Sequence, residues 1–417
     1  MADRNFDVMV LGAGIVGLAV ALKTQEKGKH VLLVDQAEAG SKTSYGNAGI
    51  IERASFLPYA FPRDVRELID YAFNRRTDAH YHFGALASVA PWLFRYWWNS
   101  EPKRYERAIA GAKPLIENCL AEHEPLIAAA GAEALIRRTG WIRAYRTEKK
   151  AEASLRDAEK LKQFGVTYDV LDKAGLAQRE PHLGDGVIGA VHYKDPANIS
   201  DPQGLSLAYR ALFEKRGGVF LNADAKSLRE EGSEWRITSP LGGLKAKDVV
   251  IALGPWAQEF VRNFGYDLPM GVKRGYHMHY GTAGNAVLNH TVYDADHSYV
   301  IAPMAKGVRL TTGAEFAHRD AKPTPVQLEK LEPKARKFFP LAERRDAEPW
   351  LGARPCTSDM LPVISKAPQH KGMWFAFGHA HHGLTLSAVT GRLIAEMIAG
   401  EEPFIDPTPY RVERFSF

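Results

Sequence analysis

The chain has 417 residues, of which 45% are hydrophobic and 25% are charged, and its formal net charge at pH 7 is +5. This length predicts two domains, or one large α/β domain with insertions, with the composition of an ordinary globular protein. Because the basic residues form no block, the sequence argues against nucleic-acid binding and leaves an anionic small ligand open. Cys119 and Cys356 lack CxxC spacing, which argues against a disulfide framework and fits a reducing, cytoplasmic setting.

The first 35 residues have the pattern of a strand, a turn, a helix and a second strand. Residues 6–11 (FDVMVL) and 30–35 (HVLLVD) are apolar runs, and the glycines at 12, 14 and 17 between them form a GxGxxG motif. The glycines interrupt the apolar stretch and no basic leader precedes it, so we do not interpret it as a signal peptide. No stretch of the sequence reaches the roughly 20 apolar residues of a membrane span.

Each glycine of this motif stands where a dinucleotide-binding turn needs one. Gly12 permits the tight turn, Gly14 lets the backbone approach a pyrophosphate, and Gly17 lets the helix pack on the strand. The helix N-terminus then offers free N–H groups to the phosphates, and Asp35 can accept hydrogen bonds from the ribose hydroxyls. The motif predicts a dinucleotide and by itself leaves NAD and FAD open.

Two later segments extend this pattern. Residues 36–51 (QAEAGSKTSYGNAGII) form a loop rich in Gly, Ser and Asn, which suits close contact with a flat polar ligand, although a surface linker has the same composition. Residues 248–257 (DVVIALGPWA) predict another buried strand that ends near Gly254, where the backbone can approach the same ligand.

Together with GARPCTSDMLPVI (352–364) and GHAHHGLTLSAVTG (378–391), these motifs resemble the D-amino-acid dehydrogenase branch of the FAD-dependent amine oxidoreductases. That superfamily also contains glycine oxidase, sarcosine oxidase and D-amino-acid oxidase, and the resemblance runs from residue 6 to about residue 415. It implies FAD as cofactor and an amine-bearing small-molecule substrate. The residues expected to contact FAD are Gly12, Gly14, Ile15, Val16, Gly17, Asp35, Gln36, Ser44, Asn47, Ala48, Gly49, Gly254, Gly383, Leu384 and Thr385.

The expected fold class is α/β (α+β overall), with a Rossmann-type FAD-binding domain and an interleaved substrate domain that contains an antiparallel sheet. Alternating apolar residues between 271 and 315 predict the strands of that sheet. We expect a discontinuous FAD-binding domain of residues 1–60, 185–262 and 345–417. The substrate-binding domain is then expected in residues 61–184 and 263–344.

Arg354, in GARPC, is the first candidate for the substrate site. A guanidinium binds both oxygens of a carboxylate, and the resemblance assigns this role to Arg354. In KRGYHMHY (273–280), a strand would place Tyr276, Met278 and Tyr280 on one face and Gly275, His277 and His279 on the other. We expect Tyr276 to offer its hydroxyl to the substrate carboxylate or to cover the flavin, with aromatic packing as the alternative.

Three histidines, His379, His381 and His382, are crowded in the sequence GHAHHG and could indicate a metal site, a proton-transfer site or a turn. A metal site has little support, because one short loop without Cys, Asp or Glu would supply every ligand. Residues 373–377 predict a strand, and a helix that ends at Gly400 follows, so the histidines lie in a strand-to-helix turn. The resemblance implies that the N-terminus of this helix faces the flavin, where its partial positive charge can stabilise negative charge. The resemblance makes His379 and His382 catalytic candidates without separating their roles.

Some relatives hold flavin covalently through a cysteine in this part of the chain. Cys356 lies closer to Asp359 than that cysteine lies to the corresponding residue, so we expect FAD to be bound without a covalent bond and no metal to be present. Cys356 is then expected to be a packed thiol.

The resemblance implies oxidative deamination of a D-amino acid or of a cyclic D-imino acid, such as D-proline or hydroxy-D-proline. Hydride transfer from the α carbon to flavin gives an imine and then a keto acid, with a quinone, an electron-transfer protein or a dye as acceptor. The alternatives are a glycine- or sarcosine-type oxidase that releases hydrogen peroxide, a NAD-dependent dehydrogenase, and a non-catalytic flavin-binding or redox-sensing protein.

Residues 91–108 (PWLFRYWWNSEPKRYERA) are the most aromatic stretch and carry several basic residues. Such a segment fits either peripheral contact with the inner face of a membrane or the aromatic core of a helical region. The first interpretation suits an enzyme that reduces a membrane quinone.

Overall fold

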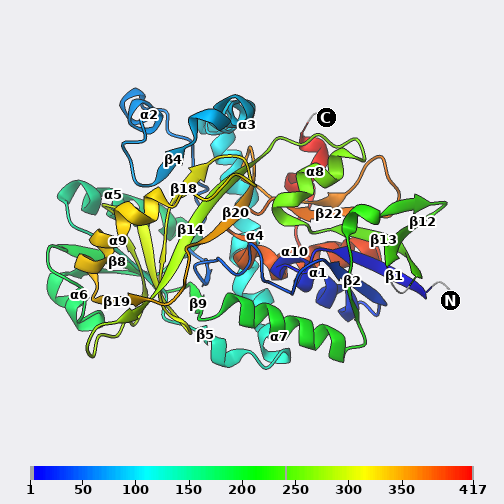
Figure 1. The fold of residues 1–417 in the computed structure, drawn as a ribbon, viewed down its shortest axis with the longest axis horizontal. Helices are drawn as coiled ribbons and strands as arrows, with labels where there is room; N and C mark the ends of the chain where they lie inside the picture. Colours follow the sequence, from blue (N-terminus) through cyan, green and yellow to red (C-terminus); the bar gives the residue numbers. More distant parts are fainter. Residues whose placement is uncertain (1–3, 240–241, 416–417) are drawn as a thin grey trace.

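The computed structural model describes residues 4–239 and 242–415, and two large sheets organise these residues (Figure 1). The first sheet contains the dinucleotide-binding motif. Parallel pairing joins β10, β2, β1, β13 and β22 in that order, and β11, β12 and β21 are added in antiparallel pairing. Its strands are β1 (Arg4–Leu11), β2 (Val31–Asp35), β10 (Val219–Asn222), β11 (Arg229–Glu231), β12 (Glu234–Ser239), β13 (Gly242–Ile251), β21 (Val363–Lys366) and β22 (Met373–Phe377).

Both faces of this sheet are buried, which explains why its strands have continuous apolar sequences. Val8 and Val10 of β1 pack in one hydrophobic cluster with the helices, whereas Met9 and Leu11 pack in a second cluster on the other face. The helices of this part are α1 (Ile15–Glu26), α4 (Pro102–Ala129), α7 (Pro202–Lys215), α8 (Ala257–Arg262) and α10 (Gly383–Ala399).

α1 and α10 pack so closely that no side chain fits between them at one point. A Cβ atom at Gly391 of α10 would lie 2.6 Å from the carbonyl oxygen of Ala19 in α1. This contact holds the C-terminal helix directly against the helix of the dinucleotide-binding motif, although 376 positions separate Ile15 from Gly391 in the chain.

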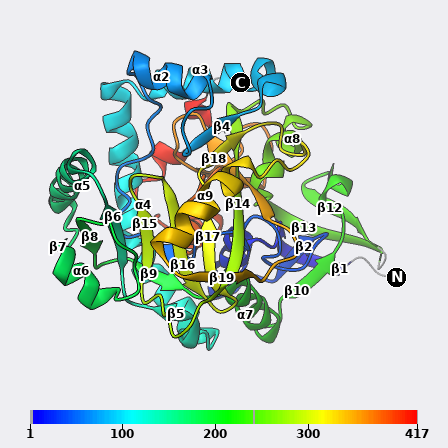
Figure 2. The ribbon, with the colours of Figure 1, turned by 60° about the vertical axis from the view of Figure 1, so that its left-hand side comes forward.

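The second sheet is mostly antiparallel and has the order β4-β18-β14-β17-β16-β15-β6-β8-β7, with β19 and β20 also paired to β14. The helices α5 (Glu148–Leu161), α6 (Lys173–Arg179) and α9 (Val326–Phe338) accompany it (Figures 1 and 2). Its strands are β4 (Ala79–Tyr81), β6 (Trp141–Tyr145), β7 (Tyr168–Asp172), β8 (Gly189–Tyr193), β14 (Met270–Thr282), β15 (Thr291–Asp294), β16 (Tyr299–Met304), β17 (Gly307–Thr311), β18 (Ala314–Phe316), β19 (Leu341–Arg344) and β20 (Trp350–Thr357).

A small three-stranded sheet follows the order β3-β9-β5, with β3 (Ile50–Ile51), β5 (Ile136–Arg137) and β9 (Ala197–Ile199). The helices α2 (Val65–Ala72) and α3 (Leu86–Asn99) lie side by side at one end of the molecule in both views (Figures 1 and 2). Short 3-10 helices span Phe83–Ala85, Glu133–Leu135, Lys162–Phe164, Ala225–Ser227, Gly254–Trp256, Thr408–Tyr410 and Val412–Arg414.

The predicted fold class and the predicted antiparallel strands between 271 and 315 are confirmed. The domain boundaries differ from the prediction for three elements. α4 falls in the segment predicted for the substrate-binding domain, but it packs with α1 and α10 in the core of the first sheet. β8 and β20 fall in the segments predicted for the FAD-binding domain, but both are hydrogen-bonded into the second sheet. Long-range strand pairing decides this membership, and hydrophobic pattern alone carries no information about which partner a strand takes. No helix in the described part of the chain is long and apolar enough to cross a membrane.

Candidate functional site

A cavity of about 1360 Å³ extends from the GxGxxG turn to β14, β20 and the turn before α10, so residues of both large sheets form its wall. Its volume exceeds the range of about 300–1,000 Å³ that is usual for small-ligand pockets. The expected site residues that line it are Gly12, Gly14, Ile15, Val16, Asp35, Gln36, Ser44, Asn47, Ala48, Gly254, Tyr276, Arg354, His379, His382, Gly383, Leu384 and Thr385.

Gly17 and Gly49 were also expected to contact FAD, but they are not part of the cavity wall. A Cβ at Gly17 would lie 1.8 Å from the carbonyl oxygen of Gly12, so Gly17 allows α1 to pack on the turn. Gly49 has φ +74°, and a Cβ there would lie 2.3 Å from the carbonyl oxygen of Ile199. Both glycines therefore lie behind the cavity wall, where they allow the backbone segments to pack closely.

Gly12 and Gly14, the other two glycines of the motif, have different surroundings. Gly12 has φ +107°, and its Cβ would lie 2.4 Å from the carbonyl oxygen of Ala252, so a side chain there would disturb the backbone. A Cβ at Gly14 would contact only the Ser44 hydroxyl, at 3.3 Å. Gly14 is thus open towards the cavity, as a close approach to a pyrophosphate requires.

Hydrogen bonds fix the groups around this turn. Both oxygens of Asp35 accept from the backbone: Oδ2 from the N–H of Ala13 at 2.7 Å and Oδ1 from the N–H of Ala37 at 2.9 Å. The hydroxyl of Ser44 accepts from the N–H of Ile15 at 3.0 Å and so joins the 36–51 loop to the start of α1. Asp35 and Ser44 therefore hold positions where the adenosine and pyrophosphate ends of a dinucleotide are expected.

The 36–51 loop is also held by a residue that sequence analysis did not identify. Arg309 of β17 donates from its guanidinium to the backbone carbonyls of Tyr45 and Asn47. Asn47 in turn accepts from the N–H of Gly49 at 2.8 Å through its side-chain oxygen. Arg309 is 3% exposed, and the loop is consequently a structured wall of the cavity and not a surface linker.

The predicted strand-to-helix turn is present between the end of β22 and the start of α10. The hydroxyl of Thr385 donates to the carbonyl of Ile50 at 3.2 Å and accepts from the N–H of Glu52 at 3.0 Å. A buried imidazole, His123, lies with Nε2 2.8 Å from the carbonyl oxygen of Leu384. The first turn of α10 is therefore fixed against both the loop and α4.

The three histidines of the turn have different surroundings. His379 is buried, and its Nε2 lies 2.9 Å from the hydroxyl of Thr390. His382 lies 3.3 Å from the hydroxyl of Ser55, and the ring of His381 lies between those of His382 and Tyr59, at centroid distances of 3.8 and 4.9 Å. Burial lowers the pKa of His379 to about 3 and that of His382 to about 4, and it also lowers the pKa of His381 well below its ordinary value. All three are neutral at pH 7.

Only one group in the described ranges has the spacing of a metal site, and it lies outside this turn. Ligand atoms of His277, His279 and Asp346 lie within 4.8 Å of one another. However, Nδ1 of His279 is 2.7 Å from Asp346, and Nε2 accepts from the guanidinium of Arg309 at 2.9 Å. Both nitrogens of His279 are already used and a cation lies beside them, which disfavours a metal ion. The expectation of a metal-free protein stays a prediction.

Arg354 lies on β20, directly opposite Lys273 of β14 in the antiparallel register. Its guanidinium donates to the carbonyls of Gly313 at 3.0 Å and Thr312 at 3.4 Å. A Cβ at Gly275 would lie 2.4 Å from Nη2 of Arg354, so the guanidinium extends across this glycine. These contacts hold Arg354 at the cavity wall through neutral partners, which leaves its charge available to an anionic ligand.

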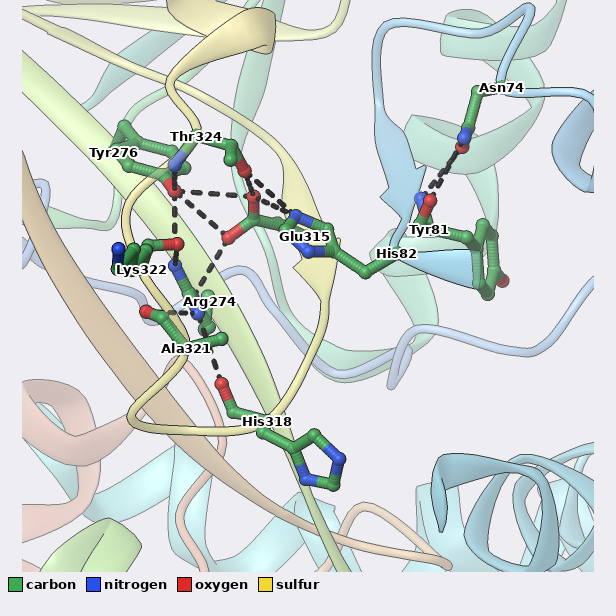
Figure 3. A network of polar contacts seen from close by, with 10 residues as sticks. All are labelled: Asn74, Tyr81, His82, Arg274, Tyr276, Glu315, His318, Ala321, Lys322 and Thr324. Atoms are coloured by element: carbon green, nitrogen blue, oxygen red, sulfur yellow. Dashed lines mark hydrogen bonds and ion pairs between the residues drawn. The ribbon is translucent and has the colours of Figure 1, made fainter. Parts of the chain in front are cut away.

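The structure gives Tyr276 a different role from the predicted one. Its hydroxyl lies 3.0 Å from Oε2 of Glu315 and accepts from the N–H of Thr324 at 2.8 Å and from Arg274 at 3.2 Å (Figure 3). The ring borders the cavity, but its face of β14 packs in the hydrophobic core of the second sheet, with Met278 and Tyr280. Because these protein partners occupy the Tyr276 hydroxyl, the structure gives no support to its predicted contact with the substrate carboxylate, and the predicted contact of the ring with flavin stays a prediction.

The same network contains a fully buried ion pair. Nε of Arg274 lies 2.8 Å from Oε2 of Glu315, and both side chains are at most 1% exposed. Arg274 also donates to the carbonyls of His318, Ala321 and Lys322, and His82 lies 2.8 Å from Glu315 (Figure 3). Because a buried charge requires such partners, this network fixes the segment between β18 and α9.

Several other cavity residues were not identified from the sequence. Glu52 accepts from the indole N–H of Trp141 at 2.9 Å, and burial raises its pKa to about 7. Trp350 packs over Gly46 and stacks on His277 at 4.8 Å. Lys273 is the first residue of the KRGYHMHY segment, but its position beside Arg354 depends on strand register. Nothing in the local sequence indicates that these residues meet.

The family model for FAD dependent oxidoreductases, abbreviated DAO, matches residues 7–397. The chain belongs to this family. It is 28% identical to a D-amino-acid oxidase of Bradyrhizobium diazoefficiens over 98% of both chains. It is 27% identical to a D-amino acid dehydrogenase of Chromohalobacter salexigens over 98% of this chain and 99% of the relative.

Solved structures agree with this assignment at the level of the fold. A glycine oxidase from Geobacillus kaustophilus superimposes with a TM-score of 0.75 at 22% identity, over 99% of this chain and 100% of the other. An L-amino acid deaminase from Proteus vulgaris gives a TM-score of 0.74 at 18% identity, over 99% and 98%. The protein is an FAD-dependent amino acid oxidoreductase, and the glycine-lined turn, the fixed Asp35 and the long cavity fit this cofactor.

The geometry of Gly14 predicts that a large side chain there removes FAD without unfolding the protein. In a Gly14→Leu variant the side chain enters the cavity, because only the Ser44 hydroxyl lies near the new Cβ. We expect colourless protein whose Tm equals that of flavin-free wild type, measured by absorbance and thermal unfolding. Gly84→Leu, at a position with no atom within 4 Å of a new Cβ, is the control and should stay yellow. A yellow Gly14→Leu protein would contradict the placement of the phosphates.

Proposed function

We propose that the protein oxidises the carbon–nitrogen bond of a D-amino acid or a cyclic D-imino acid, with D-proline and hydroxy-D-proline as candidates. The observation that carries the proposal is Arg354: a guanidinium at the wall of the FAD cavity whose hydrogen-bond partners are backbone carbonyls. The relatives named D-amino-acid oxidase and D-amino acid dehydrogenase support the D configuration. We further propose a quinone or an electron-transfer protein as acceptor.

In this proposal Arg354 binds the substrate carboxylate through two N–H groups and so sets the position of the α carbon. The neutral histidines of the turn add no charge that would compete with Arg354 for the carboxylate. When FAD is bound, it supplies the acceptor for the hydride that leaves the α carbon. Loss of the hydride from the neutral amine leaves an iminium ion, which is released and hydrolyses in water to the keto acid.

The start of α10 has an electrostatic role in this scheme. Gly383, Leu384 and Thr385 line the cavity at the N-terminus of a helix of 17 residues. This end carries free N–H groups and a partial positive charge, which stabilise negative charge nearby. Because the turn is fixed by His123 and by the Thr385 hydroxyl, it needs little reorganisation when charge develops.

Anaerobic mixing of the yellow holoenzyme with single compounds tests the proposed reaction. D-amino acids, D-proline and hydroxy-D-proline should bleach the flavin absorbance, and their L-enantiomers should not. In air, dye reduction should exceed peroxide release. Bleaching by glycine or sarcosine alone, with peroxide formed in equal amount, would favour the oxidase alternative. No bleaching by any member of the panel would overturn the proposed activity.

Replacing Arg354 should weaken substrate binding and leave FAD in place. The loss of a charged, bidentate interaction of about 3 kcal/mol predicts a decrease of roughly 100-fold in kcat/KM for Arg354→Ala, mostly through KM. Arg354→Lys should recover part of this loss because it restores the charge without the planar fork. Arg156→Ala, at a side chain that is 65% exposed, is the control. An unchanged KM in Arg354→Ala would remove this residue from the site.

We also propose that the surface formed by α2 and α3 contacts an anionic membrane. Val65 and Ile69 of α2 and its C-terminal capping residue Phe73 recur every four residues and are 68%, 46% and 65% exposed, so they form one apolar stripe that faces solvent. On α3, Phe94 and Trp98 are 62% and 49% exposed, whereas Trp92 and Tyr96 are buried. One face of α3 therefore packs in the hydrophobic core, and the other face is exposed to solvent.

Charge supports a membrane as the partner of this surface. Between residues 59 and 107 the exposed basic side chains outnumber the exposed acidic ones, which are Asp64, Glu67, Asp70 and Glu106. Apolar side chains surrounded by basic ones are typical of peripheral contact with anionic lipid. The exposed basic residues are Arg63, Arg66, Arg75, Arg95, Lys103 and Arg107.

Vesicle sedimentation tests this surface. The wild-type holoenzyme should sediment with vesicles that contain phosphatidylserine and much less with phosphatidylcholine alone. The double variant Ile69→Glu, Phe73→Glu should lose binding and keep its dye-reducing activity in solution. Val170→Glu, at an exposed position on β7, is the control and should bind like wild type. Equal loss in Val170→Glu, or no binding by wild type, would overturn the proposal.

A further inference from the structure

Two cations lie side by side in the wall of the cavity. Lys273 of β14 and Arg354 of β20 are directly opposite one another in an antiparallel pair, and both side chains line the cavity. Residues opposite each other in such a pair have their Cβ atoms about 5 Å apart on the same face of the sheet. The register thus gives the site two positive groups in fixed positions.

Neither cation is neutralised by the protein. Among residues 4–239 and 242–415, no carboxylate lies within ion-pair distance of Lys273 or Arg354, although the neighbouring Arg274, on the opposite face of β14, has Glu315 as its partner. Nζ of Lys273 donates to the hydroxyl of Tyr96 at 3.0 Å. That hydroxyl itself donates to the carbonyl of Tyr59, so Tyr96 offers Lys273 a neutral oxygen and no negative charge.

The surroundings of Lys273 are partly apolar. Its Nζ lies 4.2 Å from the ring centroid of Tyr96 and 5.9 Å from that of Trp92. Burial lowers the pKa of Lys273, the charge of Arg354 lowers it further, and burial also lowers the pKa of Arg354. Two like charges in a desolvated wall repel one another, and an anion placed between or beside them would relieve the repulsion.

We infer that Lys273 forms a subsite for a second carboxylate, so that the preferred substrates are amino or imino dicarboxylates such as D-glutamate, D-aspartate or an N-carboxymethyl amino acid. This inference rests on the proposed function, because it assumes that Arg354 binds the α-carboxylate. The second carboxylate then reaches Lys273, and the methylene groups between the two carboxylates pack against the rings of Tyr96 and Trp92. A monocarboxylate such as D-proline leaves Lys273 without a charged partner.

Binding of unreactive acids tests the subsite without turnover. Glutarate and succinate, compared with butyrate, are titrated into the holoenzyme while the flavin absorbance is followed. The wild-type protein should bind the dicarboxylates about 10- to 100-fold more tightly, which is the range for a charged hydrogen bond. Lys273→Met should lose this preference and bind butyrate as wild type does. Equal binding of dicarboxylates and butyrate by wild type would overturn the inference.

Kinetics with a matched pair of substrates separate this inference from the proposed function. D-Glutamate and D-norvaline have side chains of similar length, and only D-glutamate carries the second carboxylate. Lys273→Met should lower kcat/KM for D-glutamate about 10- to 100-fold more than it lowers kcat/KM for D-norvaline. Lys273→Arg should retain the preference, and Lys194→Met on the surface should change neither substrate.

The failures of the two proposals are distinguishable. If Lys273→Met lowers the rates of both substrates equally, or changes only the reoxidation of the reduced enzyme, the subsite is wrong and the proposed oxidation stands. If no amino acid bleaches the flavin, the proposed function is wrong. Glutarate binding then still shows whether Lys273 is an anion subsite, through its loss in Lys273→Met.

Discussion

The antiparallel pairing of β14 with β20 is the constraint on which the site depends. It runs in continuous register from Met270 opposite Thr357 to His277 opposite Trp350. Because side chains alternate between the faces of a strand, the neighbouring cations Lys273 and Arg274 of β14 lie on opposite faces of the sheet. Arg274 is directed to Glu315, whereas Lys273 and the opposing Arg354 are directed to the cavity. A shift of one residue would place Arg274 at the cavity and remove Lys273 from it.

The electrostatics of the cavity follow from this arrangement. Burial keeps the three histidines of the β22–α10 turn neutral, and burial also raises the pKa of Glu52 to about 7. Lys273, Arg354 and the N-terminus of α10 are positive groups of the cavity wall, and all three favour anionic groups. In the proposed function, these groups bind the substrate carboxylate and stabilise negative charge that develops beside α10.

The network around Glu315 connects the cavity to the end of the molecule where α2 and α3 lie. His82, next to the end of β4, contacts Glu315, and the side chain of Asn74 exchanges two hydrogen bonds with the backbone of Tyr81 (Figure 3). Partly buried hydrogen bonds of Asn74 and His82 therefore attach the exposed apolar stripe of α2 to the second sheet. This attachment holds the α2 stripe in a fixed position relative to the site.

The sequence by itself determined the dinucleotide turn, the strands and helices around it and the turn before α10, because these depend on local patterns: glycine spacing, continuous apolar runs and a helix that ends at Gly400. The family resemblance, seen in the same motifs, predicted FAD as the cofactor and Arg354 as the residue that binds the substrate carboxylate. Only the tertiary structure decided the membership of β8 and β20, the internal role of Tyr276 and the pairing of Lys273 with Arg354. Each of these depends on which strands pair and in which register, and that is set by contacts between segments far apart in the chain.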